Sequence, residues 1–221
     1  MASSTPDAVL AGARLTRDVA ASAGGAVLAQ ATRALATVRP AAKPLHPRGV
    51  VLRGRIYRHG SPEPVGVPWL DEPGEDDVQV RLSRAIGLPS AMPDIHGLAV
   101  RVGSGDLLFA STGWGRLSRF VLTASRDPRG RPMTTLLPYR TDAGPVLLGA
   151  RAVGAETFEL AWAHRAGDWQ PFAVLRLSTA RAADQHLSFD PVRHQVDGLQ
   201  QYPSVVRLRE PSYVRARRSR T

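Results

Sequence analysis

The sequence contains no cysteine, which excludes disulfide bonds, thiol catalysis and zinc sites built on thiolates. It has no apolar run of the roughly 18–20 residues that a membrane-spanning helix needs. The N-terminus does not show the charged start, apolar stretch and cleavage site of a secretory signal. We therefore expect a soluble, cytoplasmic protein without a membrane span.

Lysine is nearly absent, since Lys43 is the only lysine among 29 basic residues, against 19 acidic ones. The net charge of +10 therefore comes almost wholly from arginine. Arginine suits bidentate recognition of carboxylates, and a basic protein also attracts nucleic acid or anionic membranes. A solvated arginine-rich surface without a specific partner explains the same numbers, so charge alone does not choose a function.

The first 42 residues differ in texture from the rest. Thr5 and Pro6 suit the start of a helix, and three prolines in residues 39–47 end helical character. We expect residues 1–42 to form a helical arm and linker that packs on the main domain or on a second subunit. The second arrangement would make the protein a homo-oligomer.

Residues 43–221 form the main predicted domain, in which short strands alternate with turns rich in Gly, Pro and Asp. The candidate strands are 50–58, 77–84, 97–103, 106–111, 119–124, 146–152, 156–163 and 170–178. Eight strands with mostly short connections predict an antiparallel barrel or sandwich, and closure into a barrel removes unpaired edges. The predicted class is mainly β with flanking helices.

One strand, residues 77–84, carries a polar face that we single out. Strand alternation separates an apolar set (Val78, Val80, Leu82) from a polar set (Gln79, Arg81, Ser83). The polar set either faces solvent or lines a ligand cavity, and the sequence of this strand alone favours solvent.

The C-terminal segment contains six arginines between Arg207 and Arg220. Tyr202 and Tyr213 are the only aromatic side chains near these arginines, so the segment makes a poor stacking surface for nucleic acid and a nucleic-acid module is the less favoured interpretation. On a helix, Arg209 and Tyr213 are four residues apart and share a face, where the guanidinium stabilises a phenolate. A phenolate is an established ligand of haem iron.

A metal-dependent phosphodiesterase is a further alternative. Asp94 and His96 form an Asp-x-His pair that precedes Gly105-Asp106, and alternating carboxylates and imidazoles hold paired metals in such enzymes. The second pair follows too closely, and the remaining metal-ligand motifs are missing.

Several separated segments, taken in order, resemble the haem-dependent catalases and their shorter catalase-like relatives. They are HPRG (46–49) followed by VVLRGRI (50–56), VQVRLSRAIG (78–87), PDIHGLAVRV (93–102) with DLL (106–108), and SFDP (188–191) with RLREPSYVRARRSR (207–220). The resemblance covers roughly residues 43–221 and implies an eight-stranded antiparallel barrel that encloses haem.

The resemblance also implies roles for individual residues. His46 corresponds to the distal histidine that moves peroxide protons, and Ser83 to the serine that orients it. Tyr213 corresponds to the tyrosinate that ligates the haem iron, with Arg209 as its partner. Arg81 and Arg220 correspond to arginines that pair the haem propionates. Lys43 stands where the family has an arginine.

The implied function is reaction with hydrogen peroxide or an organic hydroperoxide. Ala110 stands where the family has a distal asparagine, and an alanine cannot donate a hydrogen bond to bound peroxide. This departure favours a peroxidase-like protein over a true catalase. It also leaves open a non-catalytic barrel that holds haem or an apolar acid.

Overall fold

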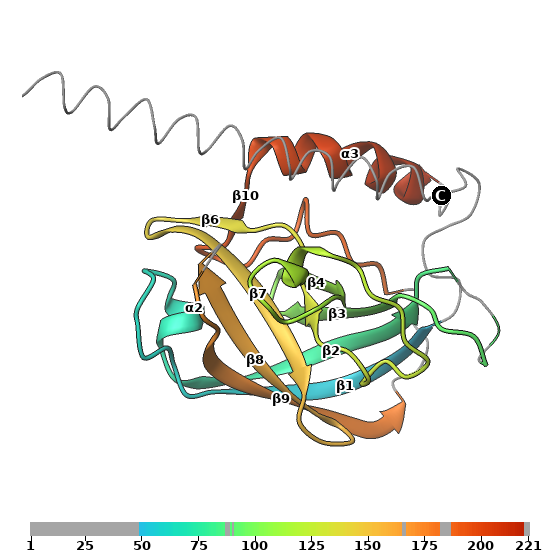
Figure 1. Ribbon diagram of the computed structural model, residues 1–221. Coiled ribbons are helices and arrows are strands. Elements are labelled where there is room, and N and C mark those ends of the chain that lie inside the picture. Colours follow the sequence, from blue (N-terminus) through green and yellow to red (C-terminus); the bar gives the residue numbers. More distant parts are fainter. Residues whose placement is uncertain (1–48, 87–88, 90, 165–166, 182–186, 219–221) are drawn as a thin grey trace, which may run out of the picture. The chain divides into compact units, whose positions relative to one another are not determined.

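A computed structural model describes residues 49–86, 89, 91–164, 167–181 and 187–218 (Figure 1). The chain divides into two units, residues 1–43 and 44–221, and all described residues belong to the second. The predicted helical arm over residues 1–42 lies outside the described residues.

The described part is a β-barrel (Figure 1). Its strands are β1 (Gly49–Arg58), β2 (Gly74–Arg84), β3 (His96–Val102), β4 (Gly105–Ser111), β5 (Met133–Thr134), β6 (Tyr139–Thr141), β7 (Gly144–Ala152), β8 (Thr157–His164), β9 (Gln170–Arg181) and β10 (Gln200–Gln201). The order β7-β5-β4-β3-β2-β1-β9-β8 closes through a β7–β8 pairing, and all these pairings are antiparallel. Strands β6 and β10 extend the sheet from β7.

Helical segments are few among the described residues. They are α2 (Pro68–Asp71), the 3-10 turn η1 (Ser118–Phe120) and α3 (Pro203–Arg218), which directly follows β10. None of the helices in the described ranges has the length and apolar character required to cross a membrane.

Side chains fill the interior of the barrel. Val78 and Val80 of β2, which the alternation assigned to an apolar face, are buried in one continuous core with Leu98 and Val100 of the neighbouring strand β3. Residues of β7, β8 and β9 on the far side belong to the same core. The interior is therefore packed with side chains, and the polar face of β2 lies on the outside of the barrel.

The antiparallel barrel and seven of the eight predicted strands are confirmed. The predicted strand 119–124 is wrong, because Ser118–Phe120 forms η1 and Leu122 makes only an isolated bridge with Thr112. The loop folds back on itself here, since the Gly113 amide donates to Ser118 O at 3.1 Å. The two-residue strand β5 completes the barrel instead.

The acidic connection over residues 63–77 is only in part a surface loop. Val65, Val67 and Leu70 are at most 2% exposed and belong to the core. The Asp71 carboxylate holds this connection together by accepting the amides of Val65 and Val67 at 3.0–3.1 Å.

Candidate functional site

Arg81 and Ser83 lie on the outer face of β2, both partly buried. Across the sheet, Ser83 is opposite Gly97 of β3, which is opposite Ala110 of β4. Arg81 precedes Ser83 on β2 by two residues, about 6–7 Å along the strand, and is opposite Ala99 of β3. Gly97 and Ala110 therefore place little side-chain bulk in the Ser83 row, whereas in the Arg81 row Ala99 is followed by Leu108 of β4.

Gly49, the first residue of β1, allows the Arg81 side chain to lie close to that strand. A Cβ atom at residue 49 would be 2.7 Å from Arg81 Nε and 2.9 Å from the Leu82 carbonyl oxygen. Gly49 also pairs with Ser83. The guanidinium of Arg81 therefore rests over the N-terminal end of β1, which is the end that follows His46 in the sequence.

Helix α3 carries Arg209 and Tyr213, both partly buried. The prediction that these residues share one helical face is confirmed, because the helix runs through both of them at a spacing of four residues. Pro211 between them costs a backbone hydrogen bond in the middle of the helix.

Tyr139 of β6 lies close enough to α3 for charged groups on that helix to affect its pKa. Its side chain is buried, and burial raises the pKa of its phenol to about 12. The Arg209 guanidinium opposes this increase, whereas Tyr213 and Asp106 add to it. The face of α3 that carries Arg209 and Tyr213 is therefore within electrostatic reach of Tyr139 at the edge of the barrel.

The segment that leads to α3 is fixed by the buried carboxylate of Asp106 on β4. Arg101 of β3 donates Nε and Nη2 to its two oxygens at 2.7 and 2.8 Å. The Asp190 amide donates to the same carboxylate at 2.7 Å, and His194 Nδ1 does so at 3.3 Å. The hydrogen bond between Arg101 and Asp106 is the largest cause of a raised pKa of Arg101. We call these residues the Asp106 clamp.

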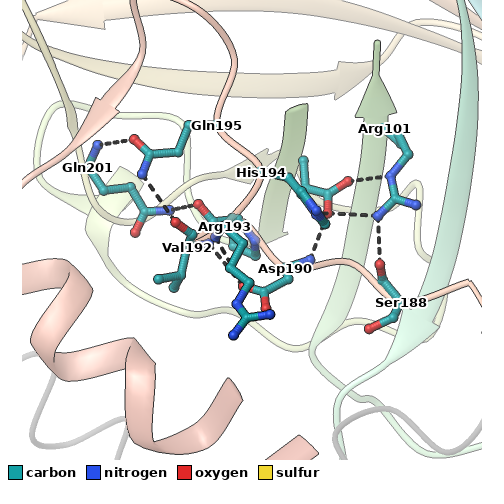
Figure 2. Close-up of polar contacts among 10 residues, drawn as sticks. Arg101, Ser188, Asp190, Val192, Arg193, His194, Gln195 and Gln201 are labelled. Carbon is teal, nitrogen blue, oxygen red and sulfur yellow. Dashed lines mark hydrogen bonds and ion pairs between the residues drawn. The ribbon is translucent and has the colours of Figure 1, made fainter. Parts of the chain in front are cut away.

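Two glutamines continue this arrangement towards α3 (Figure 2). The Gln201 amide of β10 donates to Gln195 Oε1 at 3.0 Å, and Gln201 Nε2 donates to the Pro191 carbonyl oxygen at 2.6 Å. Arg101 Nη2 also donates to the Ser188 carbonyl oxygen at 2.6 Å. The chain from Ser188 to Gln201 is therefore bonded to the barrel and to itself immediately before α3 begins.

The sequence-based interpretation missed the Asp106 clamp, although a signal for it was present. The sequence GSGD at residues 103–106 is typical of a tight hairpin turn, which places Arg101 and Asp106 opposite each other, as the structure does. Opposite charges at such positions pair across strands. The contact with Asp190 and His194, more than 80 residues away in the sequence, had no local signal.

Asp94 and His96 both make hydrogen bonds within the fold. His96 is 2% exposed and its Nε2 donates to the Ser125 carbonyl oxygen at 2.9 Å. Asp94 accepts the Ile86 amide at 3.0 Å and pairs with Arg84 at 3.4 Å. Within the described ranges, no group of three or more His, Asp or Glu side chains could hold a metal ion. The arrangement gives the phosphodiesterase alternative no support.

Of the predicted site residues, the structure describes Arg81, Ser83, Arg209 and Tyr213, which lie on two separate elements. His46, Lys43 and Arg220 lie outside the described residues. A scan of protein-family models found no match to this chain, and a search of curated proteins also found none. The resemblance to catalases therefore stays a prediction that rests on the sequence segments.

Proposed function

We propose that this chain is a catalase-like protein that binds haem and reacts with hydrogen peroxide or an organic hydroperoxide. The observation that carries the proposal is the set of side chains on the outer face of β2, β3 and β4. Arg81 and Ser83 lie there beside Gly97, Ala99 and Ala110, on the outside of a closed antiparallel barrel. This face carries a guanidinium, the group that pairs best with a carboxylate, near the small side chains of Gly97, Ala99 and Ala110.

The described residues fit haem in their chemistry. Arg81 suits a propionate, because a guanidinium makes two parallel hydrogen bonds with a carboxylate. Tyr213 would ligate the iron as a phenolate, and Arg209, one helical turn before it, favours that charged form. Since the barrel interior is filled by side chains, haem would lie against the outside of the strands and not within the barrel.

When bound, haem supplies the iron at which a peroxide is reduced. The chain's part is to move protons and orient the groups that do so. His46 would carry a proton from one peroxide oxygen to the other, which makes the departing oxygen a better leaving group. Ser83 would orient the His46 ring. Lys43 and Arg220 would add positive charge for the propionates.

The first experiment is an absorption spectrum of the full chain purified from haem-supplemented cells. We expect a Soret band that Tyr213→Phe shifts or removes, because a phenylalanine cannot ligate iron. A matched control is Tyr202→Phe, which changes a tyrosine just before α3 and leaves Tyr213 intact. Absence of haem uptake, or an identical spectrum for Tyr213→Phe, would contradict the proposal.

A second candidate function is a barrel that binds haem or an apolar acid without turnover. Ala110 favours it, because this side chain lies in the same cross-strand row as Ser83 and cannot donate a hydrogen bond to a peroxide. Steady-state peroxide consumption by the haem-loaded protein separates the two candidates. Consumption that His46→Ala abolishes supports the enzyme, and haem binding without consumption supports the binding protein.

A further inference from the structure

Arg119 in η1 is a buried cation with no ion-pair partner among the described residues. Only 1% of the residue is exposed. Its Nε donates to the Gly115 carbonyl oxygen at 3.2 Å, whereas Nη1 is buried and meets no acceptor in the described part of the chain. Burial is the largest cause of a lowered pKa of this guanidinium. A buried charge that lacks a partner is costly, so folded proteins normally pair it.

Two tryptophans form the surface on which this guanidinium rests. The Arg119 guanidinium carbon lies 4.5 Å from the ring centre of Trp169, and Trp169 stacks on Trp114 at 4.2 Å with 18° between the ring planes. Trp169 Nε1 donates to the Trp114 carbonyl oxygen at 2.7 Å. The cation–π contact orients the guanidinium, but it leaves the hydrogens of Nη1 without an acceptor.

The tryptophan stack is fitted directly to strand β7. A Cβ atom at Gly149 would lie 2.8 Å from atoms of both Trp114 and Trp169. The absence of a side chain at residue 149 is therefore what lets both rings lie against the strand. Together with the buried Arg119, this fit indicates a built site rather than a chance surface arrangement.

An exposed ion pair lies next to Arg119. Arg116 Nη2 and Asp168 Oδ1 are 3.2 Å apart, and their side chains are 65% and 79% exposed. Both act on Arg119, since the Arg116 charge lowers its pKa and the Asp168 charge raises it. Exposed ion pairs contribute little stability. The pair can therefore open at low cost, and Arg116 then becomes a second guanidinium for an incoming anion.

We propose that Arg119 on the Trp114–Trp169 stack is the centre of a binding site for an oxyanion, the carboxylate or phosphate group of a small ligand. The anion replaces Asp168 as the partner of Arg116 and, once that exposed pair has opened, reaches the buried Arg119 Nη1 and accepts a hydrogen bond from it. Asp168 thus competes with the ligand. The site is on the β7 side of the barrel and does not depend on haem binding.

The test uses the full chain and two probes, inorganic phosphate and acetate, titrated at constant ionic strength with chloride as the balancing ion. Tryptophan fluorescence reports the Trp114–Trp169 stack, and the melting temperature rises with any ligand that binds the folded state. We expect a saturable response in the unchanged protein. We expect Arg119→Met to weaken binding about tenfold or more, the usual cost of losing a hydrogen bond from a charged group.

Asp168→Asn provides the decisive comparison, because it removes the competing carboxylate at an exposed position and does not threaten folding. We expect this variant to bind the probe more tightly than the unchanged protein and Arg116→Gln to bind it more weakly. These two variants test the proposal even if Arg119→Met does not fold. Equal responses in all variants would indicate general attraction to a basic protein. No response in either the unchanged protein or Asp168→Asn would equally overturn the site.

Discussion

Arg101 and Asp106 meet across the β3–β4 hairpin through two parallel hydrogen bonds of 2.7 and 2.8 Å. The Asp106 side chain has no exposed surface, whereas that of Arg101 is 25% exposed. Because the same carboxylate holds Asp190 and His194, one buried charge on β4 fixes the segment that leads to α3. The position of Arg209 and Tyr213 therefore depends on residues that take no part in the proposed chemistry.

We predict that Asp106→Asn destabilises the protein by about 3–5 kcal/mol, because it leaves the Arg101 guanidinium partly buried without its counter-charge. An asparagine also cannot accept from all the donors that now meet the carboxylate. The free energy of unfolding in urea measures the loss. Hydrogen exchange should show faster exchange over residues 188–201 than in the unchanged protein.

The matched control for this prediction is Asp168→Asn, which breaks an ion pair of the same kind whose partners are mostly exposed. Its unfolding midpoint should stay close to that of the unchanged protein. If both variants lose equal stability, the Asp106 clamp does not fix the segment that leads to α3.

The raised pKa of Tyr139 predicts that the stability of the fold depends on pH in the alkaline range. Its pKa is raised to about 12 in the folded state, against roughly 10 in an unfolded chain. Below pH 10 both states hold the proton and the contribution of Tyr139 to stability is complete. Between about pH 10 and 12 the unfolded chain loses the proton first, so stability falls as pH rises.

Tyr139→Phe should remove this part of the alkaline loss. The measurement is the free energy of unfolding in urea at intervals from pH 8 upwards, for both proteins. The other tyrosines and the arginines contribute equally to the two curves, so their difference isolates Tyr139. Parallel curves across pH 10–12 would show that this phenol titrates normally.

Much of the barrel could be predicted because its strands alternate cleanly. In β2 the residues Val78 and Val80 are buried and the neighbouring Arg81 is on the outside, as period-two alternation requires. The same signal misled at residues 119–124, where the apolar sequence FVLT looks like a strand. There Arg119 is buried and the backbone turns, a result of tertiary contacts with Trp169 that no local pattern encodes.

The candidate site was predictable only within single elements. The spacing of Arg209 and Tyr213 predicts a common helical face, and the helix confirms it. For Arg81 and Ser83 the sequence of β2 favoured a solvent-facing position but left a ligand cavity open, because alternation gives two faces but not which one meets the core. The contacts that hold the α3 segment to β4 join distant residues and had to come from the structure.

Two buried hydroxyls predict opposite mutational effects. Ser111 Oγ accepts the His96 amide at 3.0 Å and donates to the Thr123 carbonyl oxygen at 2.6 Å. Ser111→Ala leaves both groups unsatisfied and should cost about 1–3 kcal/mol. Thr123 Oγ1 is buried and has no partner among the described residues, so Thr123→Val should be neutral or stabilising. Urea unfolding of both variants checks the contrast, and a costly Thr123→Val would contradict it.

The fit of Gly149 beneath the tryptophan stack gives a steric prediction. Gly149→Ala places a Cβ 2.8 Å from both rings and should destabilise the protein by about 1–3 kcal/mol, the usual cost of overpacking. Near-ultraviolet circular dichroism should change, because the Trp114–Trp169 stack must move. Gly154→Ala is the control, since its Cβ would meet Thr157 only at 3.5 Å, an ordinary contact distance. Equal effects of the two changes would exclude a tight fit at Gly149.

The role of Arg81 in the proposed function can be tested against an arginine on the same outer face. Arg53 of β1 is exposed, pairs with Gln79 and thus lies diagonally from Arg81. If Arg81 pairs a haem propionate, Arg81→Gln should weaken haem affinity by about tenfold or more, the loss expected for a charge-assisted hydrogen bond. Arg53→Gln should leave the affinity unchanged.

Haem titration followed by absorbance measures both, and Arg81→Lys should recover only part of the loss, because an ammonium lacks the planar pair of donors. Equal losses for Arg81→Gln and Arg53→Gln would show that general positive charge attracts haem and that the outer face of β2 does not position it.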